Sequence, residues 1–206
     1  MTNPSNQQKI FGLTGTYCAG KNHIGRLLEE RGLPVLDVDT LGHSAIEMRR
    51  DAILERFGGD ILGADGAIDR RLLGAKVFGK PAELAELEGI VHPAVNEMTL
   101  HWIAAREGKP CVINAALLHR SSAMSLLSCI ILVRAPVLLR LLRAKKRDGL
   151  PLTQLLRRFW SQRQFIPQYS AKNADIYVIE NPGYFGLGPS VLENRISEIL
   201  SRVGMA

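Results

Sequence analysis

The sequence contains few cysteines, and they form no pattern that could organise a fold. Its three cysteines, Cys18, Cys111 and Cys129, include no C-x-x-C pair. This spacing argues against a zinc-binding motif and against a disulfide framework. We therefore expect three reduced thiols, which is the usual state in a cytosolic protein.

The sequence also lacks a long apolar segment. The longest strongly apolar stretch, residues 126–133, is far shorter than the roughly 20 residues that are needed to span a bilayer. Residues 1–9 are polar and lack the charged and then apolar layout of a secretory signal. These two absences argue against a membrane partner and predict a cytoplasmic protein.

The composition that remains is ordinary for a soluble globular protein, since 46% of the 206 residues are apolar and 22% are charged. This length suits one domain, with room for a small inserted subdomain and a lid. The formal net charge of +6 favours anionic partners such as nucleic acid, acidic lipid or phosphate-rich small molecules. Composition alone does not choose among these three.

Short apolar segments alternate with helical patterns along the chain. The expected strands are residues 9–14, 35–37, 111–114, 128–133 and 175–179. Most of the chain between the second and third strands has a helical pattern, interrupted by glycines and prolines. Asp69 is the expected N-cap of a helix over residues 70–78, and His92 and Pro93 are expected to end one helical segment and begin another. This alternation predicts an α/β fold, with a parallel sheet that is covered by helices on both faces.

A glycine-rich motif follows the first expected strand and opens a helix. It fits G-x-x-x-x-G-K, and its members are Gly15, Thr16, Tyr17, Cys18, Ala19, Gly20, Lys21 and Asn22. The glycines let the backbone curl so that its N–H groups point at phosphate oxygens. The helix N-terminus and the lysine add positive charge. The motif in this context predicts a phosphate-binding loop (P-loop) for ATP, and the alternative is a chance glycine-rich turn.

Two members of this motif are unusual. Asn22 stands where serine or threonine normally offers a hydroxyl to Mg²⁺, so its carbonyl oxygen is a weak candidate ligand for the metal. Cys18 is either a thiol whose pKa is lowered by the nearby helix N-terminus or simply a small loop side chain.

Two acidic residues, Asp37 and Asp39, come at the end of the second expected strand. Ligands of open α/β sheets bind at the carboxyl ends of the strands. If the strand continues far enough, alternation places both carboxylates on one side. Asp39 is then a candidate general base that accepts a proton from an attacking hydroxyl. The alternative is that Asp39 caps a helix over residues 40–48. Beside the phosphate loop, we favour the base.

Two basic helical segments lie near residues 136–148 and 152–165. Arg140, Arg143 and Arg147 are three or four residues apart and share one helical face. Three interpretations are open: a lid that brings cations to ATP, a nucleic-acid surface, or a solvated helix face. Beside a phosphate loop, we favour the lid.

Taken together, these stretches resemble the dephospho-CoA kinase family, over residues 10–183. The most specific part of the resemblance lies between residues 57 and 93. The matching positions are Gly12–Gly15, Gly20, Lys21, Val35–Asp39, Phe57–Leu62, Asp65, Gly66, Asp69, Arg70, Val77, Phe78, Leu87, Glu88, His92, Pro93, Arg143, Arg147, Asp148, Gln162, Ala174, Asp175 and Asn181.

The resemblance implies a three-layer P-loop kinase in a single domain over residues 1–206. An acceptor-binding helical region would cover about 58–108 and a lid about 140–165. The implied reaction phosphorylates the ribose 3′-hydroxyl of dephospho-CoA with ATP and Mg²⁺. The implied catalytic residues are Asp39, Lys21 and Arg143. Residues Gly15 to Asn22, with Arg143 and Arg147, would bind ATP, and Asp39, Arg70 and His92 would bind the acceptor.

The chain departs from the family at a few positions. Asn22 replaces a serine, His23 replaces a threonine, and Arg120 stands where the family has glutamate. His23 is expected on the solvent side of the first helix. These departures keep two alternatives open: a diverged nucleotide-binding protein with weak or no kinase activity, and a kinase for another small nucleotide-like acceptor. In the favoured interpretation the partners are ATP and dephospho-CoA, not nucleic acid or membrane, and the chain is a monomer or a weak homo-oligomer.

Overall fold

The computed structural model describes residues 8–161, 175–183 and 189–205 of the 206-residue chain. It divides into two compact units. The first, which we call the core unit, contains the chain through Leu36 and from Arg106 onward. The second, which we call the helical unit, is Asp37–Ala105. Of the helical region that the sequence suggested for about 58–108, residues 58–105 lie in the helical unit and residues 106–108 lie in the core unit.

The core unit is built on a five-stranded sheet with the order β2-β3-β1-β4-β5. The central strand β1 pairs in parallel with β3 and β4, and β4 pairs in parallel with β5. This confirms the predicted α/β fold and parallel sheet. The strands are β1 (Ile10–Gly15), β2 (Val35–Asp37), β3 (Cys111–Asn114), β4 (Cys129–Arg134) and β5 (Asp175–Glu180).

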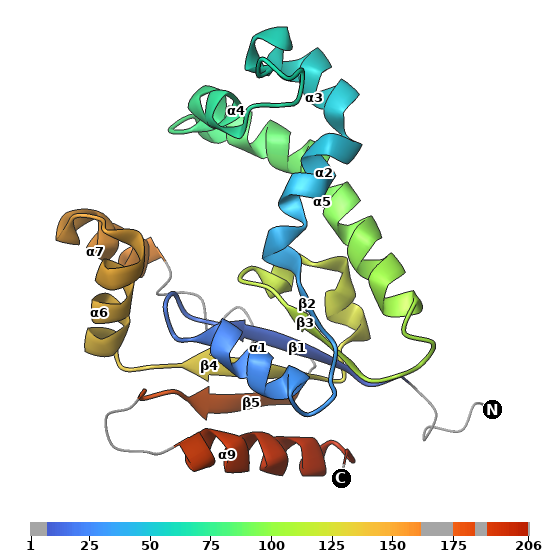
Figure 1. Ribbon diagram of the computed structural model, residues 1–206, viewed down its shortest axis with the longest axis vertical. Helices are drawn as coiled ribbons and strands as arrows, with labels where there is room; N and C mark the ends of the chain where they lie inside the picture. Colours follow the sequence, from blue (N-terminus) through green and yellow to red (C-terminus); the bar gives the residue numbers. More distant parts are fainter. Residues whose placement is uncertain (1–7, 162–174, 184–188, 206) are drawn as a thin grey trace. The chain divides into compact units, whose positions relative to one another are not determined.

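The helices of the core unit pack on this sheet because the strands are apolar on both faces. All six residues of β1 are buried. Helix α9 lies beside β5, as Figure 1 shows, and it also packs against α1. All three elements contribute to one apolar cluster. Each large side chain buried in such a core contributes about 1.5–3 kcal/mol. The helical elements are α1 (Lys21–Glu29), η4 (Leu118–Arg120), η5 (Ser122–Leu126), α6 (Val137–Asp148), α7 (Leu152–Ser161) and α9 (Pro189–Arg202).

The helical unit has a small apolar core of its own. Ile53, Phe57, Ile61 and Leu73 are buried together, and side chains from the first half of α5 pack against them. The unit therefore has an independent basis for stability. Its elements are η2 (Val38–Thr40), α2 (Gly42–Met48), α3 (Arg50–Phe57), η3 (Gly59–Ile61), α4 (Arg70–Val77) and α5 (Pro81–Ala104).

The start of α4 agrees with the capping residue that the sequence predicted. The prediction that Asp69 caps the helix at Arg70 is confirmed, because its carboxylate accepts hydrogen bonds from the N–H groups of Arg71 and Leu72. Such a cap stabilises a helix by about 1 kcal/mol.

The expectation that one helix ends and another begins at His92 and Pro93 is wrong. Helix α5 runs through Pro93 without a break. Proline removes one hydrogen bond and crowds the preceding turn. Packing on both sides keeps the helix continuous, since Val91 contacts the core of the helical unit and Ala94 is fully buried.

The two basic helices form where the sequence placed them. Helix α6 follows Pro136 and ends at Gly149, which has the left-handed conformation (φ 65°) that glycine adopts at helix ends. The described part of α7 ends at Ser161, so Gln162 and the rest of the expected lid lie outside the described residues. No helix within the described ranges combines the length and apolarity needed to cross a bilayer.

Candidate active site

The phosphate loop connects β1 to α1, as predicted, and its geometry requires glycine at both ends. Gly20 has φ 94°, and a Cβ built on it would collide with the side-chain amide of Asn181. A Cβ on Gly15 would lie 2.7 Å from the carbonyl oxygen of Val133. The loop therefore curls between two neighbouring segments that leave no room for a side chain.

The carbonyl groups of the loop accept hydrogen bonds from other parts of the core unit. Arg140 Nε donates to the carbonyl of Tyr17 at 2.8 Å, and Arg143 Nη1 donates to that of Ala19 at 3.2 Å. The side-chain amide of Asn181, which follows β5, also donates to the Ala19 carbonyl, at 2.8 Å. These bonds hold the loop in its curled form and place two guanidinium groups beside it.

Two features of the loop suit an anion. The hydroxyl of Thr16 is buried and has no hydrogen-bond partner among the described residues. Helix α1 begins at Lys21 with no described side chain as its cap, and its first turn contains no acidic residue. The partial positive charge of the helix N-terminus therefore adds to the charge of Lys21. A bound phosphate group would satisfy all of these groups.

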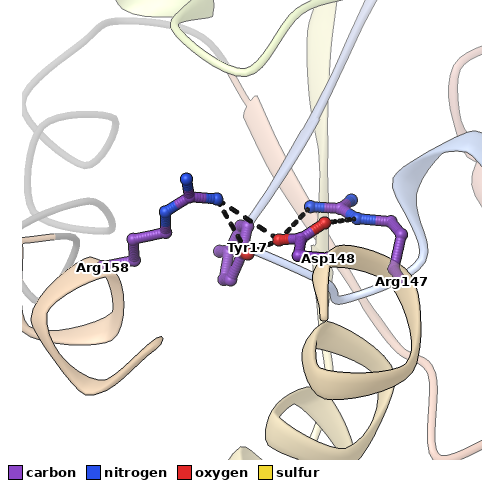
Figure 2. A network of polar contacts seen from close by, with 4 residues as sticks. All are labelled: Tyr17, Arg147, Asp148 and Arg158. Atoms are coloured by element: carbon purple, nitrogen blue, oxygen red, sulfur yellow. Dashed lines mark hydrogen bonds and ion pairs between the residues drawn. The ribbon is translucent and has the colours of Figure 1, made fainter. Parts of the chain in front are cut away.

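A second network joins the loop to α6 and α7 (Figure 2). The Tyr17 hydroxyl donates to Asp148, and Arg147 Nε donates to the same carboxylate at 2.7 Å. Arg158 Nη1 lies 3.3 Å from Asp148 Oδ2 and 3.2 Å from the Tyr17 hydroxyl oxygen. The guanidinium of Arg147 also lies 5.1 Å from the centre of the Tyr17 ring. One carboxylate thus holds two arginines and a loop side chain together.

The protonation of these groups follows from the network. The hydrogen bonds from Arg147 and then Tyr17 lower the pKa of Asp148 to about 2, so its carboxylate is charged at neutral pH. Burial, followed by the hydrogen bond to Asp148, raises the pKa of Tyr17, so its hydroxyl keeps its proton. The hydrogen bond to Asp148 is also the main reason why the pKa of Arg147 is raised.

The interpretation of Cys18 as an activated thiol is wrong. Burial raises its pKa, and this effect exceeds the opposing influence of Arg147. Burial likewise raises the pKa of Cys111 to about 11 and that of Cys129 to about 12. Cys18 is therefore the small loop side chain of the alternative interpretation.

Asp37 and Asp39, at the end of β2, are not placed as the strand pattern predicted. The strand ends at Asp37, and the chain turns at once into η2, so strand alternation does not place Asp37 and Asp39 on one side. Asp37 is the capping residue, since its carboxylate accepts a hydrogen bond from the N–H of Asp39 at 3.2 Å. The alternative in which Asp39 caps a helix is therefore also wrong, and its side chain is exposed.

The other residues expected to bind an acceptor also belong to the helical unit. Arg70 is the exposed first residue of α4, and His92 is half-buried on α5. Lys21, Arg143 and Arg147, by contrast, belong to the core unit with the phosphate loop.

Comparison with known proteins identifies the family of this chain. A sequence model of the dephospho-CoA kinase family matches residues 9–185. The chain belongs to the dephospho-CoA kinase family. The family, the fold and the class of enzyme that the sequence predicted are thereby confirmed.

Individual relatives agree over almost their whole length. A dephospho-CoA kinase from Treponema pallidum is 34% identical, over 95% of this chain and 96% of its own. One from Anaeromyxobacter dehalogenans is also 34% identical, over 94% and 91%. The solved structure of TT1252 from Thermus thermophilus superimposes with a TM-score of 0.77 at 30% identity, covering 95% of this chain and 98% of its own.

Asn22, one of the expected departures from the dephospho-CoA kinase family, lies at the start of α1. Asn22 is exposed, and its Oδ1 accepts a hydrogen bond from Nδ2 of Asn114 at 3.3 Å. Two other departures, His23 and Arg120, are exposed on α1 and at the end of η4. The prediction that His23 lies on the solvent side of α1 is therefore confirmed.

Sequence reasoning missed Asn114 and the roles of Tyr17 and Asp148. The signal for Asn114 was a polar residue at the end of an otherwise apolar strand. That signal has meaning only once the sheet order places β3 beside β1. Tyr17 and Asp148 are 131 residues apart in the sequence, so no local pattern connects them.

The residues around the loop fit a magnesium ion that is held mainly by nucleotide and water. Among the described residues there is no cluster of three or more histidine, cysteine, aspartate or glutamate side chains that could hold a metal by itself. Mg²⁺ prefers oxygen ligands and usually keeps several waters when substrate phosphates bind it. The amide oxygens of Asn22 and Asn114 are of the right chemical type for such a site.

Proposed function

We propose that this chain transfers the γ-phosphoryl group of ATP to the ribose 3′-hydroxyl of dephospho-CoA, giving CoA and ADP. The observation that carries the proposal is a curled phosphate loop with arginines bound to its carbonyls, in a chain that matches the family from residue 9 to residue 185. Its substrates are the small molecules ATP and dephospho-CoA. It acts in the cytoplasm as a monomer or weak homo-oligomer, without nucleic acid or membrane.

The core unit binds ATP. In P-loop enzymes, catalysis depends mainly on positioning and on charge stabilisation of the transferring group. Residues Gly15 to Asn22 surround the phosphates, and Lys21 supplies a full charge to the β- and γ-phosphates. Arg143, with Arg147 in the lid of about 140–165, stabilises the charge that develops on the transferring group.

Magnesium binds together with the nucleotide, and Asn22 is the loop residue that contacts it. The ion neutralises part of the phosphate charge when bound. Asn22 offers a neutral amide oxygen in place of a hydroxyl, and the hydrogen bond from Asn114 orients that oxygen.

The helical unit binds the acceptor, through the region of about 58–108 and the residues before it. Asp39 orients the ribose 3′-hydroxyl and takes its proton during the transfer. Its side chain is exposed at the end of β2, which is consistent with access to a substrate hydroxyl. Arg70 and His92 bind the acceptor, whose phosphates suit a cation such as Arg70.

The decisive experiment is an ADP-release assay with ATP and Mg²⁺, run with and without dephospho-CoA. We expect release of ADP that depends on dephospho-CoA. Binding of ATP with no such turnover would instead support a diverged nucleotide-binding protein, the alternative that Asn22 and Arg120 suggest. Turnover with another nucleoside or nucleotide, but not with dephospho-CoA, would support a kinase for a different small acceptor.

A further inference from the structure

Asn114 has an orphaned polar atom at the base of the phosphate loop. Its side chain is 3% exposed, at the carboxyl end of β3. Its Nδ2 group donates to Asn22, but its Oδ1 atom is buried and has no hydrogen-bond partner among the described residues. Buried polar atoms without partners are uncommon in folded proteins, and each one calls for an explanation such as a water or an ion.

The position of Asn114 in the sheet indicates what kind of ligand would be the partner of its Oδ1 atom. Strand β3 is the neighbour of β1, and β1 leads directly into the phosphate loop. Asn22, the partner of Asn114, follows Lys21 in the first turn of α1. The orphaned oxygen therefore belongs to the same hydrogen-bonded group as the loop residue to which the proposed function assigns the metal.

We propose that Asn22 and Asn114 form a paired amide site for the magnesium ion of MgATP, in which Asn114 Oδ1 accepts a hydrogen bond from a metal-bound water. The proposal rests on the proposed function, since it needs ATP in the loop. It adds Asn114 to the residues of the proposed function. It also gives the metal site a distinctive property, because the side chains of Asn22 and Asn114 are both electrically neutral.

The chemistry of this pair has a direct consequence. P-loop enzymes commonly use a hydroxyl together with an aspartate for the same purpose. A carboxylate attracts a divalent cation by charge, whereas two amides offer only dipoles. The negative charge that attracts the metal must therefore come from the nucleotide, so the ion binds with ATP and not before it.

A purely structural role for Asn114 gives a different expectation. If Asn114 acted only through its hydrogen bond to Asn22, Asn114→Asp, which lacks the N–H donor, would weaken metal binding just as Asn114→Leu does, instead of raising the affinity. Leucine has nearly the same branched shape without the unpaired oxygen. Removing an unsatisfied buried polar atom is neutral or stabilising. Asn114→Leu is thus expected to keep or raise the melting temperature while it weakens metal binding.

The test measures Mn²⁺ affinity by electron paramagnetic resonance in the presence of a non-hydrolysable ATP analogue. Loss of an outer contact to a metal site typically lowers affinity about 10- to 100-fold. We expect a loss of that size for Asn114→Leu, with unchanged binding of the analogue in the absence of metal. Asn194→Leu, at an exposed asparagine on α9, is the control and should leave Mn²⁺ affinity unchanged.

Two further variants keep the proposal open to refutation if Asn114→Leu does not fold. Asn114→Asp adds a charge in the same shape and should raise Mn²⁺ affinity, both with and without nucleotide. Asn22→Ala should lower affinity, and its effect should not add to that of Asn114→Leu if the two residues act as one site.

The outcomes separate this inference from the proposed function. Equal Mn²⁺ affinity in the native protein, Asn114→Leu and Asn114→Asp would overturn the paired amide site, even if the kinase is active. Failure of the native protein to bind any ATP analogue would overturn both proposals. Turnover with dephospho-CoA together with the expected affinity changes would support both.

Discussion

The two units of this protein hold their functional side chains in different ways. In the core unit, the phosphate loop receives hydrogen bonds from Arg140, Arg143 and Asn181, and Tyr17 is tied to Asp148. In the helical unit, the side chains of Asp39 and Arg70 are exposed. In the proposed function, the nucleotide side would therefore be arranged in advance, whereas the acceptor side would be completed by its substrate. Preorganisation of this kind lowers the cost of positioning at the moment of reaction.

The sharpest way to test this comparison is to remove the proposed base. Asp39→Asn keeps the size of the side chain but cannot take a proton. We expect kcat to fall about 10²- to 10⁴-fold, measured by ADP release, while ATP affinity stays the same. Asp51→Asn, at an exposed aspartate in the first turn of α3, is the matched control. Unchanged turnover in Asp39→Asn would show that another group deprotonates the acceptor.

The next largest effect is expected on the nucleotide side. Arg143→Ala removes a cation that lies at the loop carbonyls, and we expect kcat to fall about 10²- to 10³-fold. Lys146→Ala removes an exposed cation from the same helix and should have little effect. Steady-state kinetics with both substrates would measure the difference. Equal losses in the two variants would mean that α6 contributes only general positive charge.

The shape of the loop can be tested at its glycines. Gly20→Ala introduces a Cβ that collides with Asn181 at a positive φ, so we expect ATP affinity to fall at least about tenfold, or by about 1.4 kcal/mol. Gly32 has a similar φ of 78°, but no described atom lies within 4 Å of a Cβ built there. Gly32→Ala should therefore lower stability by about 1–2 kcal/mol through backbone strain alone, and leave ATP affinity intact. Calorimetric titration and thermal melting would separate the two effects.

The smallest effect is expected from the Asp148 carboxylate, which joins the phosphate loop to α6 and α7. The folded pKa of Asp148, about 2, lies below the ordinary value of about 3.9. Its stabilising contribution is therefore complete above pH ~5 and is lost as the pH falls through about 4 towards 2. Asp148→Asn should melt a few degrees below the native protein at pH 7, and this gap should narrow as the pH falls from about 4 towards 2. A gap that is constant with pH would mean that the charge of Asp148 does not matter.

The local parts of this structure could be predicted from the sequence. The phosphate loop, the Asp69 cap and the start of α6 after Pro136 depend on neighbouring residues, so their signals lie within a few positions of each other. The alternation of strands and helices was enough to predict the parallel sheet.

The remaining features depend on contacts between distant segments. Pro93 sits within α5 because packing on both sides outweighs the lost hydrogen bond, and packing cannot be read from a local pattern. Asp37, not Asp39, became the cap because β2 is only three residues long. The contact between Asn22 and Asn114 needed the order of the strands.

The raised pKa values of the cysteines have a practical consequence. Burial favours the protonated form of Cys18, Cys111 and Cys129, and it is the thiolate that attacks alkylating reagents. The purified protein should therefore resist iodoacetamide and survive handling in air without a reducing agent. Cys18 is the most accessible of the three, so any slow labelling would mark the phosphate loop and give a chemical footprint of nucleotide occupancy.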